Sequence, residues 1–178
     1  MIETERLVLR AWEARDRVAF RAMGLDPAVM RHLGPLRSDE ESDATIERLQ
    51  AQQAEHGHCF WAVERRGDGA FLGFCGLIRN GIEGTPIDGE IEIGWRLRSD
   101  AWGQGYAQEG AEASLAWGWR DLPDARIAAI TVEANTASWG LMERLGMTRV
   151  EDGDFDHPGV PDESPLKRHI LYRIGRPA

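Results

Sequence analysis

One stretch of this chain, residues 89–119, constrains the fold more than any other. It begins with alternating acidic and apolar residues, EIEI at positions 90–93, and this period of two predicts a strand. Gly103 and Gly105 then stand two positions apart in front of a helix-forming run, which predicts a tight turn. Apolar residues recur every four positions in that run and predict a helix face that packs on a sheet. These residues are Ala107, Ala111, Leu115 and Trp119.

The glycine turn also has the form of an anion-binding site. Small residues at positions 103, 105 and 107 let a ligand approach the backbone closely. The N–H groups of the first helical turn have no partner within the helix, and they stabilise negative charge. Such a turn is also often only a connection, so both interpretations stay open. Two nucleotide-binding motifs are absent: there is no G-x-x-x-x-G-K-S/T phosphate loop, and the third glycine of the dinucleotide fingerprint is missing.

Composition limits the domain organisation and the partners. A length of 178 residues with 42% hydrophobic residues suits one well-buried domain and is short for two, so residues 1–178 are expected to form a single domain. The net charge is −9, from 30 acidic and 21 basic residues without a basic block. This balance disfavours a nucleic-acid partner, because nothing would displace counterions from phosphate, and it fits a cationic partner better.

The location is expected to be cytoplasmic. Cys59 and Cys75 are the only cysteines and could form at most one disulfide. The first ten residues, MIETERLVLR, carry charges where a signal peptide needs an apolar run. No segment reaches the roughly 18 apolar residues needed to span a membrane. A reduced protein without a membrane partner is therefore expected.

The rest of the chain alternates between strand and helix patterns. Strands are predicted at 6–11, 60–65, 71–78, 126–132, 147–150 and 166–174, in addition to the one that ends at Leu97. Helical segments are predicted at 13–23, 26–33, 38–56 and 136–145, in addition to the one that follows Gly105. Ser38 and Glu41 form a capping-box pattern, and the residues between 66 and 69 predict a hairpin.

Five segments and the order of the elements resemble the GNAT superfamily of acetyl-CoA-dependent N-acetyltransferases. The segments are ETERLVLRAWEARD (3–16), EIGWRL (92–97), WGQGYAQEG (102–110), EANTASWGLMERLGM (133–147) and HILYRI (169–174). They are similar to the RimJ/RimL branch, which acetylates protein N-termini and other amines. The resemblance covers nearly the whole chain. It implies an α/β (α+β) GNAT fold, with a mixed, mostly antiparallel seven-stranded sheet, about four helices, and a split between the fourth and fifth strands.

The resemblance also implies a reaction and a cofactor site. An amine attacks the thioester of acetyl-CoA directly and releases CoA, without a metal. The pantetheine arm would lie in the split and pair with backbone groups near Trp95, Arg96 and Leu97. The pyrophosphate would be held by the backbone of Gly103, Gln104, Gly105, Tyr106 and Ala107. The superfamily has Gln or Arg where this chain has Trp102. Arg144 could supply charge near a CoA phosphate, or it could only complement the helix dipole.

The attacking amine must be neutral, which makes a base useful. An N-terminal amine, with a pKa of about 8, is roughly a tenth neutral at pH 7, whereas a lysine near 10.4 is almost wholly charged. Glu92 is the candidate base, because several superfamily members carry a glutamate at about this place on the central strand. Glu90 lies two residues earlier on the same strand face. Alternatively, both glutamates are solvated and pair across strands with Arg or Lys.

A proton donor could assist the departing thiolate. Many superfamily members use a tyrosine seven residues after the Asn of the fourth motif, but this chain has Met142 there. A serine three residues after that Asn is the alternative in this branch, which assigns Asn135 to pantetheine and Ser138 to the sulfur. The simpler interpretations are a helix cap for Asn135 and a first-turn residue for Ser138. A thiol with a pKa of about 8.5 could also leave unaided.

Acceptor recognition is expected in the variable segments 32–38, 80–89 and 152–165. The acids there could steer a cation or simply be solvated; they are Asp39, Glu40, Glu83, Asp88, Asp152, Asp154 and Asp156. His157, Trp61 and Trp95 are further pocket candidates, although a tryptophan on a strand is usually core. The acceptor is expected to be a protein or peptide N-terminus or a small amine. A detoxifying acetyltransferase for a polyamine or aminoglycoside and a non-catalytic acyl-CoA-binding module are the alternatives. The oligomeric state stays open, although this branch often forms homodimers.

Overall fold

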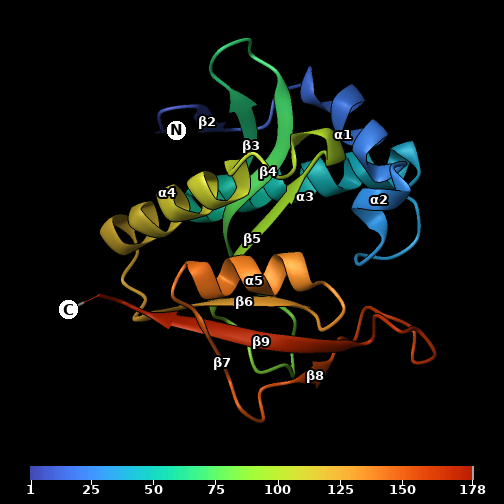
Figure 1. Cartoon of the computed structure of the whole chain (residues 1–178), viewed down its shortest axis with the longest axis vertical. Helices are drawn as coiled ribbons and strands as arrows, with labels where there is room; N and C mark the ends of the chain where they lie inside the picture. The colour runs from blue at the N-terminus through green and yellow to red at the C-terminus, as the bar shows by residue number, and fades with distance from the viewer. Residues whose placement is uncertain (178) are drawn as a thin grey trace.

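The computed structural model describes residues 1–177, which form a sheet with helices on both of its faces (Figure 1). The strands are β1 (Ile2–Glu3), β2 (Leu7–Arg10), β3 (Phe60–Arg65), β4 (Phe71–Arg79), β5 (Ile91–Leu97), β6 (Arg126–Val132), β7 (Thr148–Arg149), β8 (Phe155–Asp156) and β9 (Arg168–Gly175). The helices are α1 (Asp16–Gly24), α2 (Pro27–Met30), α3 (Asp39–His56), α4 (Tyr106–Asp121) and α5 (Thr136–Arg144), with a short 3-10 turn, η1 (Ser99–Ala101).

The sheet is mixed and mostly antiparallel, as predicted. Its order is β1-β2-β3-β4-β5-β6-β9-β7, and β8 pairs with β9. Only β5 and β6 run parallel. The described residues contain nine strands rather than the seven predicted, because two-residue pieces, β1 and β8, pair with β2 and β9. They also contain five α-helices rather than about four, if the four-residue α2 is counted.

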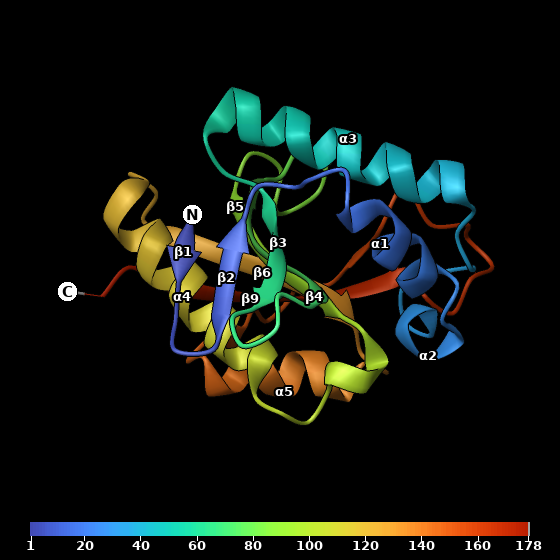
Figure 2. The same ribbon diagram turned by 90° about the horizontal axis from the view of Figure 1, so that it is seen from above.

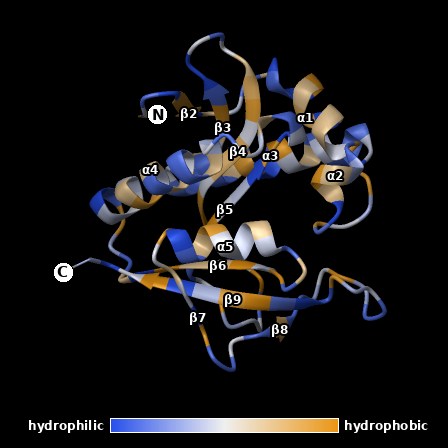
Figure 3. Ribbon diagram, viewed as in Figure 1, coloured by the Kyte–Doolittle hydropathy of each residue, from blue (hydrophilic) through white to orange (hydrophobic). Residues whose placement is uncertain are grey.

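The helices divide between the two faces of the sheet. Figure 2 shows α3, with α1 beside it, on one face, and α4 and α5 on the other. The predicted capping box at the start of α3 is confirmed: Ser38 Oγ accepts from the Glu41 N–H at 3.2 Å, and Glu41 Oε2 accepts from the Ser38 N–H at 2.8 Å. Hydropathy follows these layers, with apolar residues on the central strands and hydrophilic residues on the outer helix faces and loops (Figure 3).

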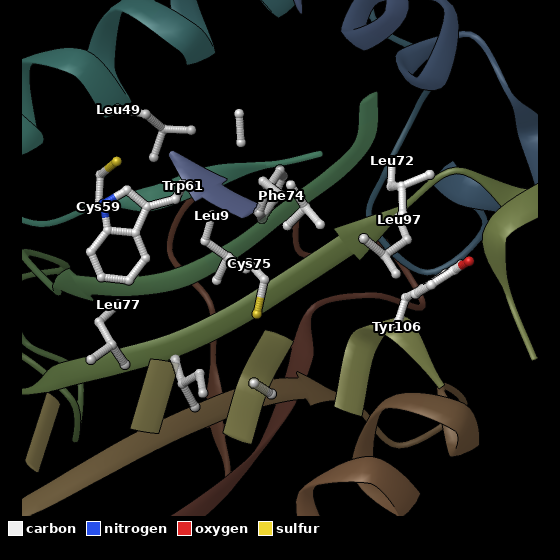
Figure 4. Close-up of a cluster of buried hydrophobic side chains, with 14 of the residues drawn as sticks. Leu9, Leu49, Cys59, Trp61, Leu72, Phe74, Cys75, Leu77, Leu97 and Tyr106 are labelled. Atoms are coloured by element: carbon white, nitrogen blue, oxygen red, sulfur yellow. The ribbon is translucent and has the colours of Figure 1, made fainter. Parts of the chain in front are cut away.

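Helix α4 packs closely on the centre of the sheet. A Cβ added at Gly118 would lie 2.6 Å from Leu77 Cδ1 of β4, so a larger residue would push the helix away. Cys75 of β4 points to α4, and its sulfur lies 3.8 Å from Ser114 Oγ (Figure 4). Cys59 and Cys75 are both free and buried, and burial raises the pKa of each thiol to about 12. Trp61 is also core, as its place on a strand suggested.

The start of α1 differs from the prediction for a physical reason. The helix was predicted from residue 13 and begins at Asp16. The buried Asp16 carboxylate accepts from the Glu13 N–H and from both terminal nitrogens of Arg10, each at 2.8 Å. These bonds hold residues 13–15 in a turn between β2 and α1. No helix among residues 1–177 is long and apolar enough to cross a membrane.

The predicted split lies between β5 and β6. The two strands pair only at Ile91–Ile127 and Glu92–Ala128, and then they diverge (Figure 1). At the two ends of the β4–β5 ladder, Arg98 N–H bonds Leu72 and Asn80 N–H bonds Glu90. Because ladder bonds alternate along an antiparallel pair, the even-numbered residues of β5 bond β4. The backbone groups of the odd-numbered residues, Trp95 and Leu97 among them, therefore face the split.

Candidate active site

A cavity of about 570 Å³ lies at the open end of the split. Residues 28–33, around α2, contribute one wall, and β5, the glycine turn, α4 and α5 contribute the others. It brings together most of the predicted cofactor residues, namely Trp95, Arg96, Leu97, Gly103, Gly105, Tyr106, Ala107, Asn135 and Arg144, together with Ser138. Gln104 and Glu92 are not in its lining. The Gln104 side chain instead donates to the Asp100 carbonyl at 3.1 Å.

The glycine turn has the backbone shape that an anion site needs. Gly103 and Gly105 have φ angles of 72° and 81°, in the left-handed region that favours glycine. Gly105 is the N-cap of α4, and no side chain caps this helix end. An added Cβ at Gly103 would meet nothing within 4 Å, so the space beside the backbone is open. The turn therefore fits a pyrophosphate held by backbone N–H groups.

Arg6 braces this turn from a distant part of the sequence. Its Nη1 donates to the Gln104 carbonyl at 2.9 Å, and its guanidinium lies 4.7 Å from the centre of the Tyr106 ring. Its Nε bonds Glu109 of α4 at 2.6 Å, and Thr4 Oγ1 bonds the same carboxylate. These contacts could not be predicted from the sequence, because no local pattern links residue 6 to residue 104.

The end of β5 is held by Trp102. Its indole Nε1 donates to the Leu97 carbonyl at 2.9 Å, and half of the residue is exposed. Trp102 lines the cavity at the position where the superfamily pattern has Gln or Arg. The Leu97 carbonyl thus already has a donor, and Arg96 bonds β4 through its backbone. Arg96 therefore contributes to the cavity through its side chain.

Helix α5 brings two of the predicted residues to the cavity: Asn135 at its start and Ser138 in its first turn. Asn135 is at the N-cap position, but its side chain makes no capping bond and donates to Thr131 Oγ1 at 3.2 Å. Ser138 lines the cavity, and its hydroxyl forms no hydrogen bond with the described residues. Met142 is buried in the core. Arg144 ends the helix and lines the cavity without a salt bridge to any of residues 1–177.

Glu92 lies where β5 and β6 begin to diverge. The carboxylate accepts a hydrogen bond of 2.5 Å from Asn80 Nδ2, and the buried Asn80 is itself oriented by the Ile82 N–H, which donates to its Oδ1. Burial raises the pKa of Glu92 to about 7, although the Asn80 bond opposes this shift. A carboxylate with a pKa near neutral pH is suited to act as a general base. No local pattern in the sequence predicts this contact between Asn80 and Glu92.

Glu90 has a different environment. Its carboxylate bonds Arg126 at 2.5 Å and Arg173 at 2.9 and 3.0 Å, so it pairs across strands. The sequence left open that both Glu90 and Glu92 pair across strands with arginine or lysine. Among the described residues, the structure shows such pairing for Glu90 and not for Glu92.

Three of the seven acids expected to steer a cation form ion pairs. Asp39 bonds Arg21 at 3.2 Å, Asp154 bonds Arg149 at 2.7 Å, and Asp156 bonds Arg168 at 3.4 Å. His32 lines the cavity, as expected for the segment 32–38. His157 does not, because it stacks on Phe155 and His169 outside the lining.

The pKa of Glu92 predicts a pH-dependent stability. Its carboxyl is neutral in both states below about pH 4.5, and above about pH 7 the folded protein must hold a charge in a desolvated place. The contribution of Glu92 to the stability of the folded protein should therefore fall as pH rises from 4.5 through 7. Glu92→Gln removes this term, which is roughly 1 kcal/mol after allowance for solvent screening. The quantity to measure is the melting temperature of Glu92→Gln minus that of wild type. We expect this difference to be about 2–4 °C larger at pH 8 than at pH 5. An equal difference at both pH values would contradict the burial of this charge.

Comparisons with known proteins agree with this geometry. The acetyltransferase (GNAT) domain family matches residues 6–148. The Bacillus subtilis protein YkkB, which is uncharacterised, is 32% identical over 145 residues, which are 81% of this chain and 83% of YkkB. A GNAT-family acetyltransferase from Bacillus anthracis has a TM-score of 0.78 at 26% identity, over 98% of both chains. RimL, a ribosomal L7/L12 alpha-N-protein acetyltransferase solved with coenzyme A, has a TM-score of 0.76 over 97% of this chain and 95% of its own. At 19% identity, RimL shows likeness of fold alone.

The chain belongs to the GNAT acetyltransferase family. The predicted mixed fold is confirmed, and the protein is an acetyl-CoA-dependent N-acetyltransferase that transfers an acetyl group to an amine. Acetyl-CoA is its co-substrate, and it supplies the thioester that the amine attacks. The uncapped glycine turn, the open strand edge and the cavity between them suit the pyrophosphate and pantetheine arm of this molecule.

Proposed function

We propose that this protein, with residues 1–178 as one domain, acetylates a primary amine by direct attack on acetyl-CoA. The acceptor is a peptide or protein N-terminus, as in the RimJ/RimL branch, or a small amine. The observation that carries the proposal is the Asn80-bound carboxylate of Glu92 at the point where β5 and β6 diverge. A cytoplasmic location, expected from the composition, and a homodimer, implied by the branch, belong to the same proposal.

In this proposal Glu92 acts as the general base. It removes a proton from the acceptor ammonium or amine, directly or through water, while the amine nitrogen forms its bond to the thioester carbon. Asn80 holds the carboxylate in place through its 2.5 Å bond. The carbon–sulfur bond then breaks, and the electron pair leaves with the sulfur of CoA.

The cavity residues hold the co-substrate. The backbone N–H groups of residues 103–107 bind the pyrophosphate, and the Trp95 backbone, which faces the split, pairs with the pantetheine arm. Asn135, whose side chain does not cap α5, offers its amide to the same arm. Arg144 provides a positive charge for a phosphate at the mouth of the cavity.

Ser138 donates a proton or hydrogen bond to the departing sulfur. The sulfur of a thioester carries no proton and departs with the electron pair of the broken bond, so a hydroxyl close to it stabilises the negative charge that develops there. We expect Ser138→Ala to lower kcat by about tenfold, the scale of one lost hydrogen bond. Thiol release by the variant and by wild type is the test, with calorimetry to check that acetyl-CoA still binds. A wild-type kcat in Ser138→Ala would remove Ser138 from the departure of the thiolate.

Thiol release from acetyl-CoA tests the proposed function itself. The assay offers a panel of N-terminal peptides and a panel of small amines, including polyamines and aminoglycosides. Release with either panel alone supports the transferase and identifies the acceptor class. Binding of acetyl-CoA by calorimetry without release for any amine would favour a non-catalytic acyl-CoA-binding module instead.

A further inference from the structure

Arg96 is a partly buried cation without an ionic partner among residues 1–177. The residue lines the cavity, and its Nε is inaccessible to solvent and lacks a hydrogen-bond partner among the same residues. The guanidinium lies 5.2 Å from the centre of the Phe74 ring. Phe74 in turn contacts Phe20 of α1, with 6.2 Å between ring centres. The Arg96 side chain therefore lies on the α1–α3 face of the sheet, opposite α4.

Among residues 1–177, no acidic group forms a salt bridge with Arg96. Burial, together with the positive charges of Arg37 and Arg48, lowers the pKa of Arg96 to about 10, and the group stays charged at neutral pH. Within the part of the chain that the structure describes, neither Arg37, Arg48 nor Arg96 forms a salt bridge. Most arginines of this acidic protein do form one.

Arg10 is a buried arginine of the same sheet that has ionic partners within the chain. Its guanidinium is bonded by Asp16 at 2.8 Å and by Glu64 at 2.9 Å. Burying an unpaired charge costs free energy unless a partner compensates it. The contrast indicates that the partner of Arg96 is supplied from outside the chain.

The position of Arg96 connects it to the proposed base. Side chains alternate along a strand, so Glu92, Gly94 and Arg96 share one face of β5. Four residues of strand separate Glu92 and Arg96 by about 13 Å between Cα atoms. Between them, an added Cβ on Gly94 would lie 2.7 Å from Phe60 Cζ, and Phe60 stacks on Phe74 with 5.4 Å between ring centres. The rings of Phe60 and Phe74 thus form an apolar surface between the Glu92 carboxylate and the Arg96 guanidinium.

We propose that Arg96 binds an anionic group of the acceptor, a carboxylate or a phosphate, while the acceptor amine lies at Glu92. The inference rests on the proposed function, and it narrows the acceptor to an amine that also carries a negative charge at a distance from the amine, such as an acidic peptide. A polyamine or aminoglycoside would place further positive charge beside the unpaired guanidinium of Arg96, which disfavours that class. The net charge alone had suggested the opposite.

Matched acceptor pairs test this proposal. The carboxylate arm compares dipeptides and tripeptides with their C-terminal amides, and the phosphate arm compares phosphoethanolamine with ethanolamine. Each pair is measured by thiol release from acetyl-CoA and by calorimetric binding to the CoA-loaded protein, with wild type, Arg96→Met, Arg96→Lys and Arg120→Met. Arg120 is an exposed arginine of α4 paired with Asp121, so its variant is a control that loses the same charge.

We expect the wild-type protein to prefer the anionic member of one acceptor pair, because that member has the lower KM. Arg96→Met should lower the anionic-to-neutral ratio of kcat/KM by about 10- to 100-fold relative to wild type, the scale of a charged hydrogen bond. Arg96→Lys should restore part of it, because it keeps the charge but not the planar fork. Arg120→Met should leave the ratio unchanged. Which pair responds identifies carboxylate or phosphate.

Three results would overturn the inference: an unchanged ratio in Arg96→Met, calorimetric binding that does not favour the anionic member of either pair, or a loss of acetyl-CoA affinity in Arg96→Met. The last would assign Arg96 to the co-substrate. Failure of the proposed function would look different. In that case no amine would release thiol, while calorimetry on the CoA complex would still report whether anionic members bind better.

Discussion

Replacing Gly105 with aspartate is expected to weaken acetyl-CoA binding at least 100-fold, about 2.7 kcal/mol. Gly105 begins α4 with a φ of 81°, and its neighbours donate the N–H groups proposed to hold the pyrophosphate. An added Cβ would lie 3.3 Å from Arg6 Nη2, so the new side chain would disturb the brace of the turn. Its carboxylate would also place a negative charge where the cofactor brings two more.

Calorimetry with acetyl-CoA measures this effect, and Gly69→Asp is the matched control. Gly69 lies in the β3–β4 hairpin with a φ of 71°, and an added Cβ there would meet nothing within 4 Å. Both variants suffer the strain of a left-handed residue, but only one faces the cavity. Gly105→Ala, which adds strain without charge, should lose less affinity than Gly105→Asp. Normal affinity in a folded Gly105→Asp protein would refute the assignment of the turn.

Glu92→Gln is expected to lower turnover by about 100-fold, the lower end of what a general base contributes. Glutamine has nearly the same shape, and its carbonyl can still accept from Asn80, but it cannot take a proton at neutral pH. Acetyl-CoA affinity should stay at the wild-type value, because Glu92 lies outside the cavity lining.

The pH profile gives this prediction a second readout. In wild type, kcat/KM should rise with pH through about 7, as Glu92 loses its proton and becomes able to accept one. In Glu92→Gln this inflection should disappear and leave only the titration of the acceptor amine. Glu90→Gln serves as the control: it removes a carboxylate two residues away that pairs with Arg126 and Arg173, so it should lower stability and keep the inflection. An unchanged rate in Glu92→Gln would exclude Glu92 from the mechanism.

Local patterns predicted most of the elements because those elements depend on neighbouring residues. The strands at 60–65 and 126–132 match the prediction at both ends, since a period of two or a short apolar run is decided within the segment. The capping box at Ser38 is confirmed for the same reason, because its bonds join residues three positions apart. The two-residue strands β1 and β8 were missed, since each is too short to show a period of two and is defined only by its pairing with the next strand.

The sequence by itself determined the order of the elements, the glycine turn before α4 and the family resemblance, because these reside in short segments and their spacing. Only the tertiary structure distinguished Glu92 from Glu90, which are two residues apart and chemically identical. Asn80 bonds the first and two arginines bond the second, and the chain brings those partners from other strands and loops. The brace of Arg6 on residue 104 and the unpaired charge of Arg96 have the same origin. Burial and the choice of partner depend on which remote residues meet, and no local pattern records that.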